Sequence, residues 1–319
     1  MGSGFLAKSS VGHGKRPQLH SLLWACFFFV ASAACAAAPL HLASISRSHH
    51  HHAHRRHRGT GVQPNLRSSE ALVLDTTSHR VLYARKPDVP VPIASITKLM
   101  TTLVVAEAKQ PLDEELEVTS ADRAIGIGAY SRLAVGTRLT RAELFHLALM
   151  ASENRAAHAL ARNYPGGVAA CVRAMNAKAR KLGMIHTHYA EPTGLSSNDT
   201  STPDDLAKLV MAAAQSPVIR QYSTSRGYTI RSGRHMVAYR NTDALVDRRS
   251  WHIVVQKTGF TNAAGHCLVM QAVIDHRTVV MVLLNSWGKY TRVADARRVA
   301  QWMKAKPAHH VVRQVASRA

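Results

Sequence analysis

Downstream of residue 70, apolar residues gather in short runs that are typical of β-strands. The runs 71–74 and 81–84 flank a polar turn and predict a hairpin. Near the other end of the chain, the runs 252–257, 266–274 and 278–284 predict three more strands. The tight turn Asp275-His276-Arg277 joins the last two runs, so we expect those strands to pair antiparallel.

Helical patterns fill the region between these strands. Three prolines, at 87, 90 and 92, precede a helix that we expect from residue 94 to residue 108. Thr140 and Glu143 have the spacing of a capping box and open a second helix that continues to residue 150. Further helices are expected after Asn154, over 168–182 before Gly183, and over 290–304. We therefore expect one α+β domain, with the N-terminal and C-terminal strands in a single antiparallel sheet and a helical lobe against it.

The N-terminal segment has the order of a secretory signal peptide. Lys15 and Arg16 precede an apolar run at 22–30, which passes into the small residues of 31–38. We assign residues 1–38 to this signal and expect the rest of the chain in the periplasm. An uncleaved membrane anchor is the alternative, because the segment approaches the length that spans a bilayer. Lipid attachment through Cys26 or Cys35 is less favoured, since neither follows the usual Leu-then-small pattern.

The next segment, 39–69, is rich in His and Arg and has no apolar periodicity, which predicts a disordered linker. His-rich tracts can bind metal, but no second set of ligands accompanies this one, so a solvated tether is preferred. A folded domain at 70–306 and a basic tail at 307–319 complete the chain. With 46% apolar residues, the chain can supply a sizeable core.

Two cysteines, Cys171 and Cys267, remain after cleavage of the predicted signal. A disulfide is permitted in an oxidising compartment. However, Cys171 lies in a helical pattern and Cys267 in a strand-like run, so two separate buried thiols fit equally well. The sequence leaves both alternatives open.

Ser95-Ile96-Thr97-Lys98 stands at the start of the first expected helix. Residues three apart share a helix face, so the Ser95 hydroxyl and the Lys98 amine can meet. A lysine kept neutral by burial can serve as the base that a serine nucleophile needs. The same pattern also fits an ordinary helix start with a solvated lysine.

Two more segments carry polar groups at element ends. Ser152-Glu153-Asn154 lies between two helical segments, where it offers a hydroxyl and an amide, although a plain helix cap explains it equally well. Lys257-Thr258-Gly259 ends an expected strand and offers a cation and a hydroxyl for an anionic group. An edge strand blunted by a lysine is the simpler interpretation. The three segments in this order, 57 and 105 residues apart, make a joint coincidence improbable.

Together the motifs resemble those of the penicillin-binding protein and serine β-lactamase superfamily, with S-x-x-K, S-x-N and K-T-G intact. Within it, the chain is most similar to the low-molecular-mass D-alanyl-D-alanine endopeptidases. The similarity covers roughly residues 70–303 and is closest in four segments: 92–100, 150–157, 164–167 and 257–267. It implies a β-lactamase/transpeptidase-like α+β fold.

The resemblance also implies roles for individual residues. Ser95 would be the acylated nucleophile, Lys98 its general base, and Ser152 a proton relay. Asn154 would bind the substrate peptide. The D-alanine side would be bound by Lys257, Thr258 and Gly259, and the oxyanion hole would consist of the backbone N–H groups of Ser95 and Phe260. No metal and no cofactor is implied.

Two features favour an endopeptidase over the carboxypeptidases of this superfamily. Those carboxypeptidases usually have Ser-Gly-Asn and an extra β-rich domain, whereas this chain has Glu153 and ends 62 residues after Lys257. Glu191-Pro192-Thr193-Gly194-Leu195 superficially resembles the loop that carries the deacylating glutamate of class A β-lactamases. It lacks the Asn after Leu195, so we interpret Glu191 as part of a structural turn.

The predicted function is therefore a serine endopeptidase that cleaves D-alanyl-meso-diaminopimelate crosslinks of peptidoglycan and is inhibited by β-lactams. A carboxypeptidase and a non-catalytic peptidoglycan-binding or β-lactam-sensing module are the alternatives. The formal net charge of +22 fits an acidic wall polymer better than nucleic acid, because no nucleic-acid-binding motif accompanies it and export removes that partner. Peripheral association with the membrane or the wall stays open.

Overall fold

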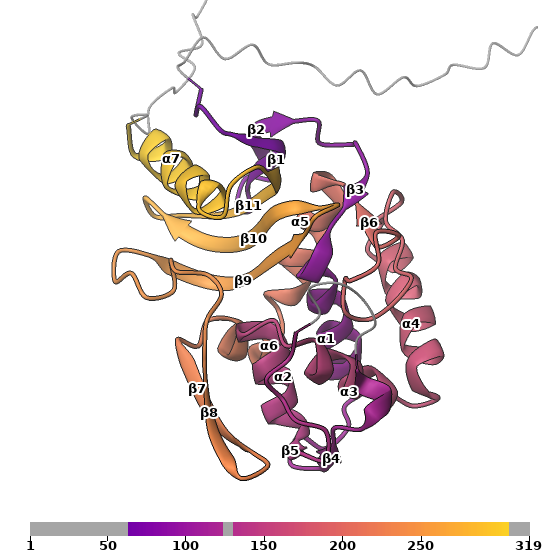
Figure 1. Cartoon of the computed structure of the whole chain (residues 1–319). Helices are drawn as coiled ribbons and strands as arrows, with labels where there is room; N and C mark the ends of the chain where they lie inside the picture. Colours follow the sequence, from indigo (N-terminus) through magenta and orange to yellow (C-terminus); the bar gives the residue numbers. More distant parts are fainter. Residues whose placement is uncertain (1–62, 124–129, 306–319) are drawn as a thin grey trace, which may run out of the picture. The chain divides into compact units, whose positions relative to one another are not determined.

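The computed structural model describes residues 63–123 and 130–305 (Figure 1). The predicted signal peptide, most of the predicted linker and the predicted basic tail lie outside these residues. The first strand, β1, begins at Ser68, two residues before the domain boundary expected from the sequence. No helix within the described ranges combines the length and the apolar character needed to cross a membrane.

Five antiparallel strands form the main sheet, in the order β2-β1-β11-β10-β9. Two come from the start of the described chain and three from its end: β1 (Ser68–Asp75), β2 (Arg80–Arg85), β9 (His252–Thr261), β10 (Gly265–Ile274) and β11 (Arg277–Ser286). Leu72 of β1 lies opposite Val282 of β11, which confirms that strands from both ends of the domain share one sheet. Asp275 and His276 both have positive φ, as expected of the two central residues in a tight hairpin turn.

The sheet separates two hydrophobic cores, because successive side chains of a strand point to opposite faces. Val73 and Met281 pack in the smaller core beneath α7 (Thr291–Ala305), while Leu72 and Val282 pack in the larger core with the helical lobe. Figure 1 shows α7 on one side of the sheet and the lobe on the other. The alternation of side chains along each strand therefore explains why the sheet has a hydrophobic core on each of its faces.

Six helices form the lobe, and the first four match the predicted ones. Thr140 accepts a hydrogen bond from the backbone of Glu143, and the Glu143 carboxylate accepts one from the Thr140 backbone, so the predicted capping box is confirmed. The lobe consists of α1 (Thr97–Glu107), α2 (Arg141–Met150), α3 (Asn154–Arg162), α4 (Gly167–Lys181), α5 (Pro203–Ala213) and α6 (Pro217–Ser223). Sequence analysis missed α5 and α6, although Thr202 and Ser216 precede a proline at the first helical position, a typical helix start.

Three short two-stranded ladders were also not predicted. They are β3 (Val91–Pro92) with β6 (Thr200–Ser201), β4 (Glu115–Glu117) with β5 (Arg138–Thr140), and β7 (Gly227–Ser232) with β8 (His235–Arg240). One predicted boundary was wrong: β9 continues to Thr261, so Lys257 lies inside the strand and not at its end. Pairing with β10 extends the strand, since Phe260 still lies opposite His266.

Candidate active site

Ser95 lies in a 3₁₀ turn, η1 (Ala94–Ile96), directly before α1, and not in the α-helix itself as the sequence suggested. Ala94 has a φ of 49°, a left-handed conformation that non-glycine residues rarely adopt. Lys98 follows in the first turn of α1, and its Nζ is 2.8 Å from the Ser95 Oγ. The expected proximity of this serine and this lysine is therefore confirmed.

Lys98 is fully buried, and three oxygen atoms surround its amine. Besides Ser95, these are Oδ1 of Asn154 at 2.7 Å and the backbone carbonyl of Thr193 at 2.6 Å. Burial lowers the pKa of Lys98 to about 8, and the negative charges of Glu191 and Glu153 only partly oppose this shift. A fraction of the lysine is therefore neutral near physiological pH.

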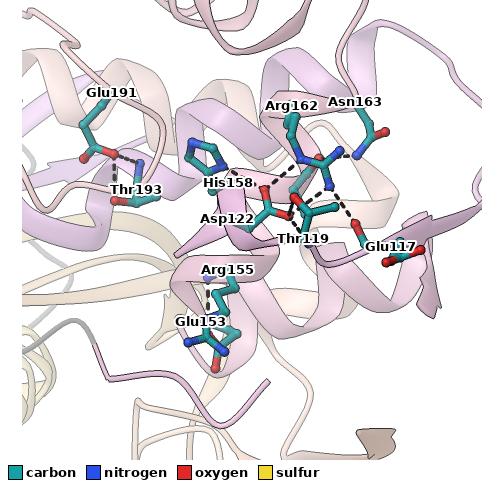
Figure 2. A network of polar contacts seen from close by, with 11 residues as sticks. Glu117, Thr119, Asp122, Glu153, Arg155, His158, Arg162, Asn163, Glu191 and Thr193 are labelled. Carbon is teal, nitrogen blue, oxygen red and sulfur yellow. Dashed lines mark hydrogen bonds and ion pairs between the residues drawn. The ribbon is translucent and has the colours of Figure 1, made fainter. Parts of the chain in front are cut away.

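Ser152 and Asn154 come from the connection between α2 and α3. Ser152 has a φ of 62°, the left-handed region in which strain accompanies a non-glycine residue. Glu153 is the N-cap of α3, and its carboxylate accepts a hydrogen bond from the backbone N–H of Arg155 (Figure 2). This cap fixes the start of α3, so that Asn154, its first residue, meets Lys98.

Edge strand β9 brings the third motif opposite the first two. The Nζ of Lys257 donates to the Ser152 Oγ and to the Thr258 carbonyl, both at 2.8 Å. Burial lowers the pKa of Lys257 well below its usual value, and the charges of Lys98 and Arg292 lower it further. Residues 105 positions apart in the chain thus share one hydrogen bond across the lobe and the sheet.

Gly259 allows β9 to pass close to the serine. A Cβ placed on Gly259 would lie 3.0 Å from the Ile93 carbonyl and 3.1 Å from the Ser95 backbone nitrogen. Its neighbour Phe260 has an exposed side chain. The structure therefore brings Ser95, Lys98, Ser152, Asn154 and Lys257 together, with Thr258, Gly259 and Phe260 along the adjoining strand.

The turn at 191–195 supports the site from behind. The Glu191 carboxylate accepts hydrogen bonds from the hydroxyl and backbone N–H of Thr193 (Figure 2). It also accepts them from the backbone N–H groups of Leu195 and Ser196. These bonds outweigh the effect of burial and lower the pKa of Glu191. Gly194, at φ 81°, has no room for a Cβ, which would lie 1.9 Å from the Ala94 carbonyl. This use of the carboxylate agrees with the interpretation of Glu191 as part of a structural turn.

Sequence reasoning missed Thr193 and Arg292. Thr193 contributes only a backbone carbonyl, which no sequence motif can reveal. Arg292, in the first turn of α7, is 9% exposed, and its Nη1 lies 2.7 Å from Nδ1 of His266. Arg292 lies 35 residues beyond Lys257 in an ordinary amphipathic helix, so no sequence motif singled it out.

A buried carboxylate braces the outer side of α3. Asp122 accepts hydrogen bonds from the side chains of His158 and Arg162 and from the backbone of Thr119 (Figure 2). Burial by itself would raise the pKa of Asp122, but these hydrogen bonds dominate and lower it to about 2. Asp122 therefore ties the 3₁₀ turn Ser120–Asp122 to the helix that begins with Asn154.

A serine hydroxyl beside a buried lysine, on an antiparallel sheet with a helical lobe, is typical of serine acyl-transfer enzymes of the penicillin-binding type. Residues 58–288 match the model of the peptidase S11 family, described as D-alanyl-D-alanine carboxypeptidase. The chain belongs to this family of serine hydrolases.

Relatives and solved structures agree with this family. The D-alanyl-D-alanine endopeptidase of Pseudomonas aeruginosa is 48% identical over 77% of this chain and 80% of its own length. That of Escherichia coli is 47% identical over the same shares. The crystal structure of a Streptomyces DD-transpeptidase has a TM-score of 0.71 and 25% identity, covering 77% of this chain and all of that one. The α+β fold expected from the sequence is confirmed.

Proposed function

We propose that this chain is an exported serine D,D-endopeptidase that hydrolyses D-alanyl-meso-diaminopimelate crosslinks of peptidoglycan and is acylated by β-lactams. The observation that carries the proposal is the Ser95–Lys98 pair, 2.8 Å apart, within a family of serine peptidases. The similarity to relatives named endopeptidases supports this specificity.

The contacts of Lys98 suit it to the role of base. Asn154 Oδ1 and the Thr193 carbonyl are acceptors, so they take the two N–H bonds of a neutral amine. The remaining lone pair then faces Ser95 and accepts its proton. The lowered pKa of Lys98 makes this neutral form accessible.

Ser95 Oγ attacks the carbonyl carbon of D-alanine while its proton passes to Lys98 Nζ. The oxyanion is held by the backbone N–H groups of Ser95 and Phe260. The C–N bond breaks, and the leaving amine takes this proton from Lys98 through Ser152, which returns Lys98 to its neutral form. Water then attacks the ester carbonyl and gives a proton to Lys98. The ester C–O bond breaks, and Lys98 returns the proton to the Ser95 Oγ.

The remaining polar groups position the substrate. Asn154 binds the donor peptide, and Lys257 with Thr258 binds the D-amino acid that leaves. Its carboxylate is attracted by two cations, Lys257 and Arg292, which are close enough for the pKa of Lys257 to be lowered by the charge of Arg292. Coulombic attraction between these cations and the carboxylate favours binding of the leaving amino acid here.

The compartment and architecture proposed for the whole chain follow from its sequence. Residues 1–38 act as the signal peptide and deliver the enzyme to the periplasm. The linker follows from residue 39, the catalytic domain begins with β1 at Ser68, and 307–319 form the tail. The excess of basic residues favours retention on the acidic wall.

The proposal is tested by incubating purified protein with crosslinked muropeptide dimers and separating the products chromatographically. We expect monomers from the wild type and none from Ser95→Ala, while Ser78→Ala, in an exposed turn, retains activity. Trimming of terminal D-alanine from pentapeptides without dimer cleavage would identify a carboxypeptidase. Absence of fluorescent-penicillin labelling at Ser95 would identify a non-catalytic binding module.

A further inference from the structure

Three large aromatic side chains are exposed near the end of the sheet at which Gly259 lies. Trp287 is 98% exposed and Tyr290 71%, in the segment that joins β11 to α7, and Phe260 in β9 is 54% exposed. Trp residues usually bury most of their surface, so exposed aromatic rings gathered at one end of a sheet are a candidate binding surface. The site described above uses none of these three rings.

The register of the sheet places these rings at one end of it. Phe260 lies opposite His266, and His266 lies opposite Ser286, so the three residues form a row across β9, β10 and β11. Two strand spacings separate the ends of this row by about 10 Å. Trp287 directly follows Ser286, at the same end of the sheet as Gly259. Figure 1 shows these three strands side by side, with α7 next to β10.

Neighbouring groups hold part of this surface in place. The Phe260 ring stacks on His266 with centroids 4.2 Å apart, and Arg292 forms a hydrogen bond with Nδ1 of His266. Lys289, which is exposed, lies over the Tyr290 ring at 5.6 Å. The surface therefore combines flat rings with an exposed cation, Lys289.

The proposed reaction leads the substrate to this surface. If Lys257 and Thr258 hold the leaving D-amino acid, the donor peptide continues past Gly259 toward the end of β9. A stem of about four extended residues spans at most about 14 Å, which is comparable with the distance across the three strands. The sugar that carries the donor stem then arrives near Trp287.

We propose that Trp287 and Tyr290 form a saccharide subsite for the amino sugar that carries the donor stem peptide, with Lys289 facing carboxylates of that stem. One face of a pyranose ring carries mainly C–H groups, which pack against an aromatic ring, while its hydroxyls stay in water. The exposed cation complements the acidic stem. This inference rests on the proposed endopeptidase function.

The test compares two substrates that share the same crosslinked peptide: a disaccharide-bearing dimer and the same dimer freed of its sugars by an amidase. Trp287→Ala should lower kcat/KM for the sugar-bearing dimer about five- to tenfold, as expected for the loss of one aromatic contact. It should leave kcat/KM for the sugar-free dimer and the rate of labelling by fluorescent penicillin unchanged. Trp287→Tyr, which keeps an aromatic ring, should retain most of the wild-type kcat/KM for the sugar-bearing dimer.

Ile185→Ala is the matched control, because Ile185 is also exposed, at 78%, but lies beyond the C-terminal end of α4. It should change kcat/KM for neither substrate. Equal losses of kcat/KM for both substrates with Trp287→Ala would show a structural role and overturn the proposal. An unchanged kcat/KM for both substrates would also overturn it. Loss of co-sedimentation with anionic vesicles, without a substrate effect, would assign the surface to a membrane instead.

A separate readout distinguishes this proposal from the function on which it rests. If the wild type is labelled by penicillin but cleaves neither dimer, the endopeptidase proposal fails. Tryptophan fluorescence is then titrated with the N-acetylglucosaminyl-N-acetylmuramic acid disaccharide. Quenching in the wild type that is lost in Trp287→Phe supports the subsite, and absence of quenching overturns it.

Discussion

At the scale of single residues, Lys98 shows how burial produces reactivity. Its spacing from Ser95 is local, and the sequence predicted their contact correctly. The lowered pKa has another origin, because it comes from burial, and residues that enclose the amine, such as Asn154 and Thr193, lie 56 and 95 positions away in the chain. A motif therefore predicted which residues meet but not the protonation state that results.

The rate of acylation should follow the protonation of Lys98. Because its pKa is lowered to about 8, the neutral base becomes more abundant as pH rises toward that value. The second-order rate of labelling by fluorescent penicillin should rise with pH and level off above about 8. Lys98→Arg should lower this rate at least a hundredfold, about the lower limit for loss of a general base.

Lys109→Arg is the control for this measurement, since Lys109 is exposed just beyond α1. Lys109→Arg should retain the wild-type dependence of the labelling rate on pH. A rate that is independent of pH, or that rises only near the ordinary lysine pKa, would contradict the role of Lys98 as base.

At the scale of elements, the position of α3 depends on side chains that cap and brace it. The N-cap Glu153 fixes its first turn, and Asp122 binds His158 and Arg162 on its flank. Sequence analysis predicted the helix and its start but missed the brace. Asp122 lies 40 residues before Arg162, and nothing local connects them.

Removal of the Asp122 carboxylate should therefore destabilise the fold. Asp122→Ala leaves Arg162 and His158 without their acceptor, which should lower the free energy of unfolding by about 2 kcal/mol. Urea unfolding followed by circular dichroism measures this change. The exposed pair Arg138–Glu115 provides the control, since Glu115→Ala should cost less than about 1 kcal/mol.

Acid should weaken the same brace. The pKa of Asp122 is lowered to about 2 in the folded state from 3.8, so its stabilisation is complete above pH 3.8 and is lost as pH falls through about 2. The difference in stability between wild type and Asp122→Ala should therefore shrink on acidification. A constant difference would exclude an ionised Asp122 as the source.

At the scale of the whole molecule, the sheet holds the ends of the domain together while the lobe is inserted between β2 and β9. The pairing of β1 with β11 joins residues more than 200 positions apart, and Asp295 of α7 also accepts bonds from the Arg67 and Ser68 backbone. The described cysteines do not contribute a crosslink. Cys171 and Cys267 are both free and buried, which decides the alternatives left open by the sequence.

Both thiols should be protected only by the fold. Burial raises the pKa of Cys267 to about 11 and that of Cys171 to about 12, so neither should react in the native protein. Alkylation in denaturant without reductant should modify both, as measured by mass spectrometry of their peptides. A peptide that is alkylated only after reduction would reveal a disulfide.

Features that depend on neighbours in the chain were accessible from the sequence: the Ser95–Lys98 spacing, the capping box at Thr140, the hairpin turn at Asp275 and the period of the strands. Such features arise from backbone geometry over a few residues. The contact of Lys257 with Ser152, the burial of Arg292 and the exposure of Trp287 at the end of β11 depend on which segments pack together. Long-range packing sets burial, and burial sets the charge and reactivity of each group.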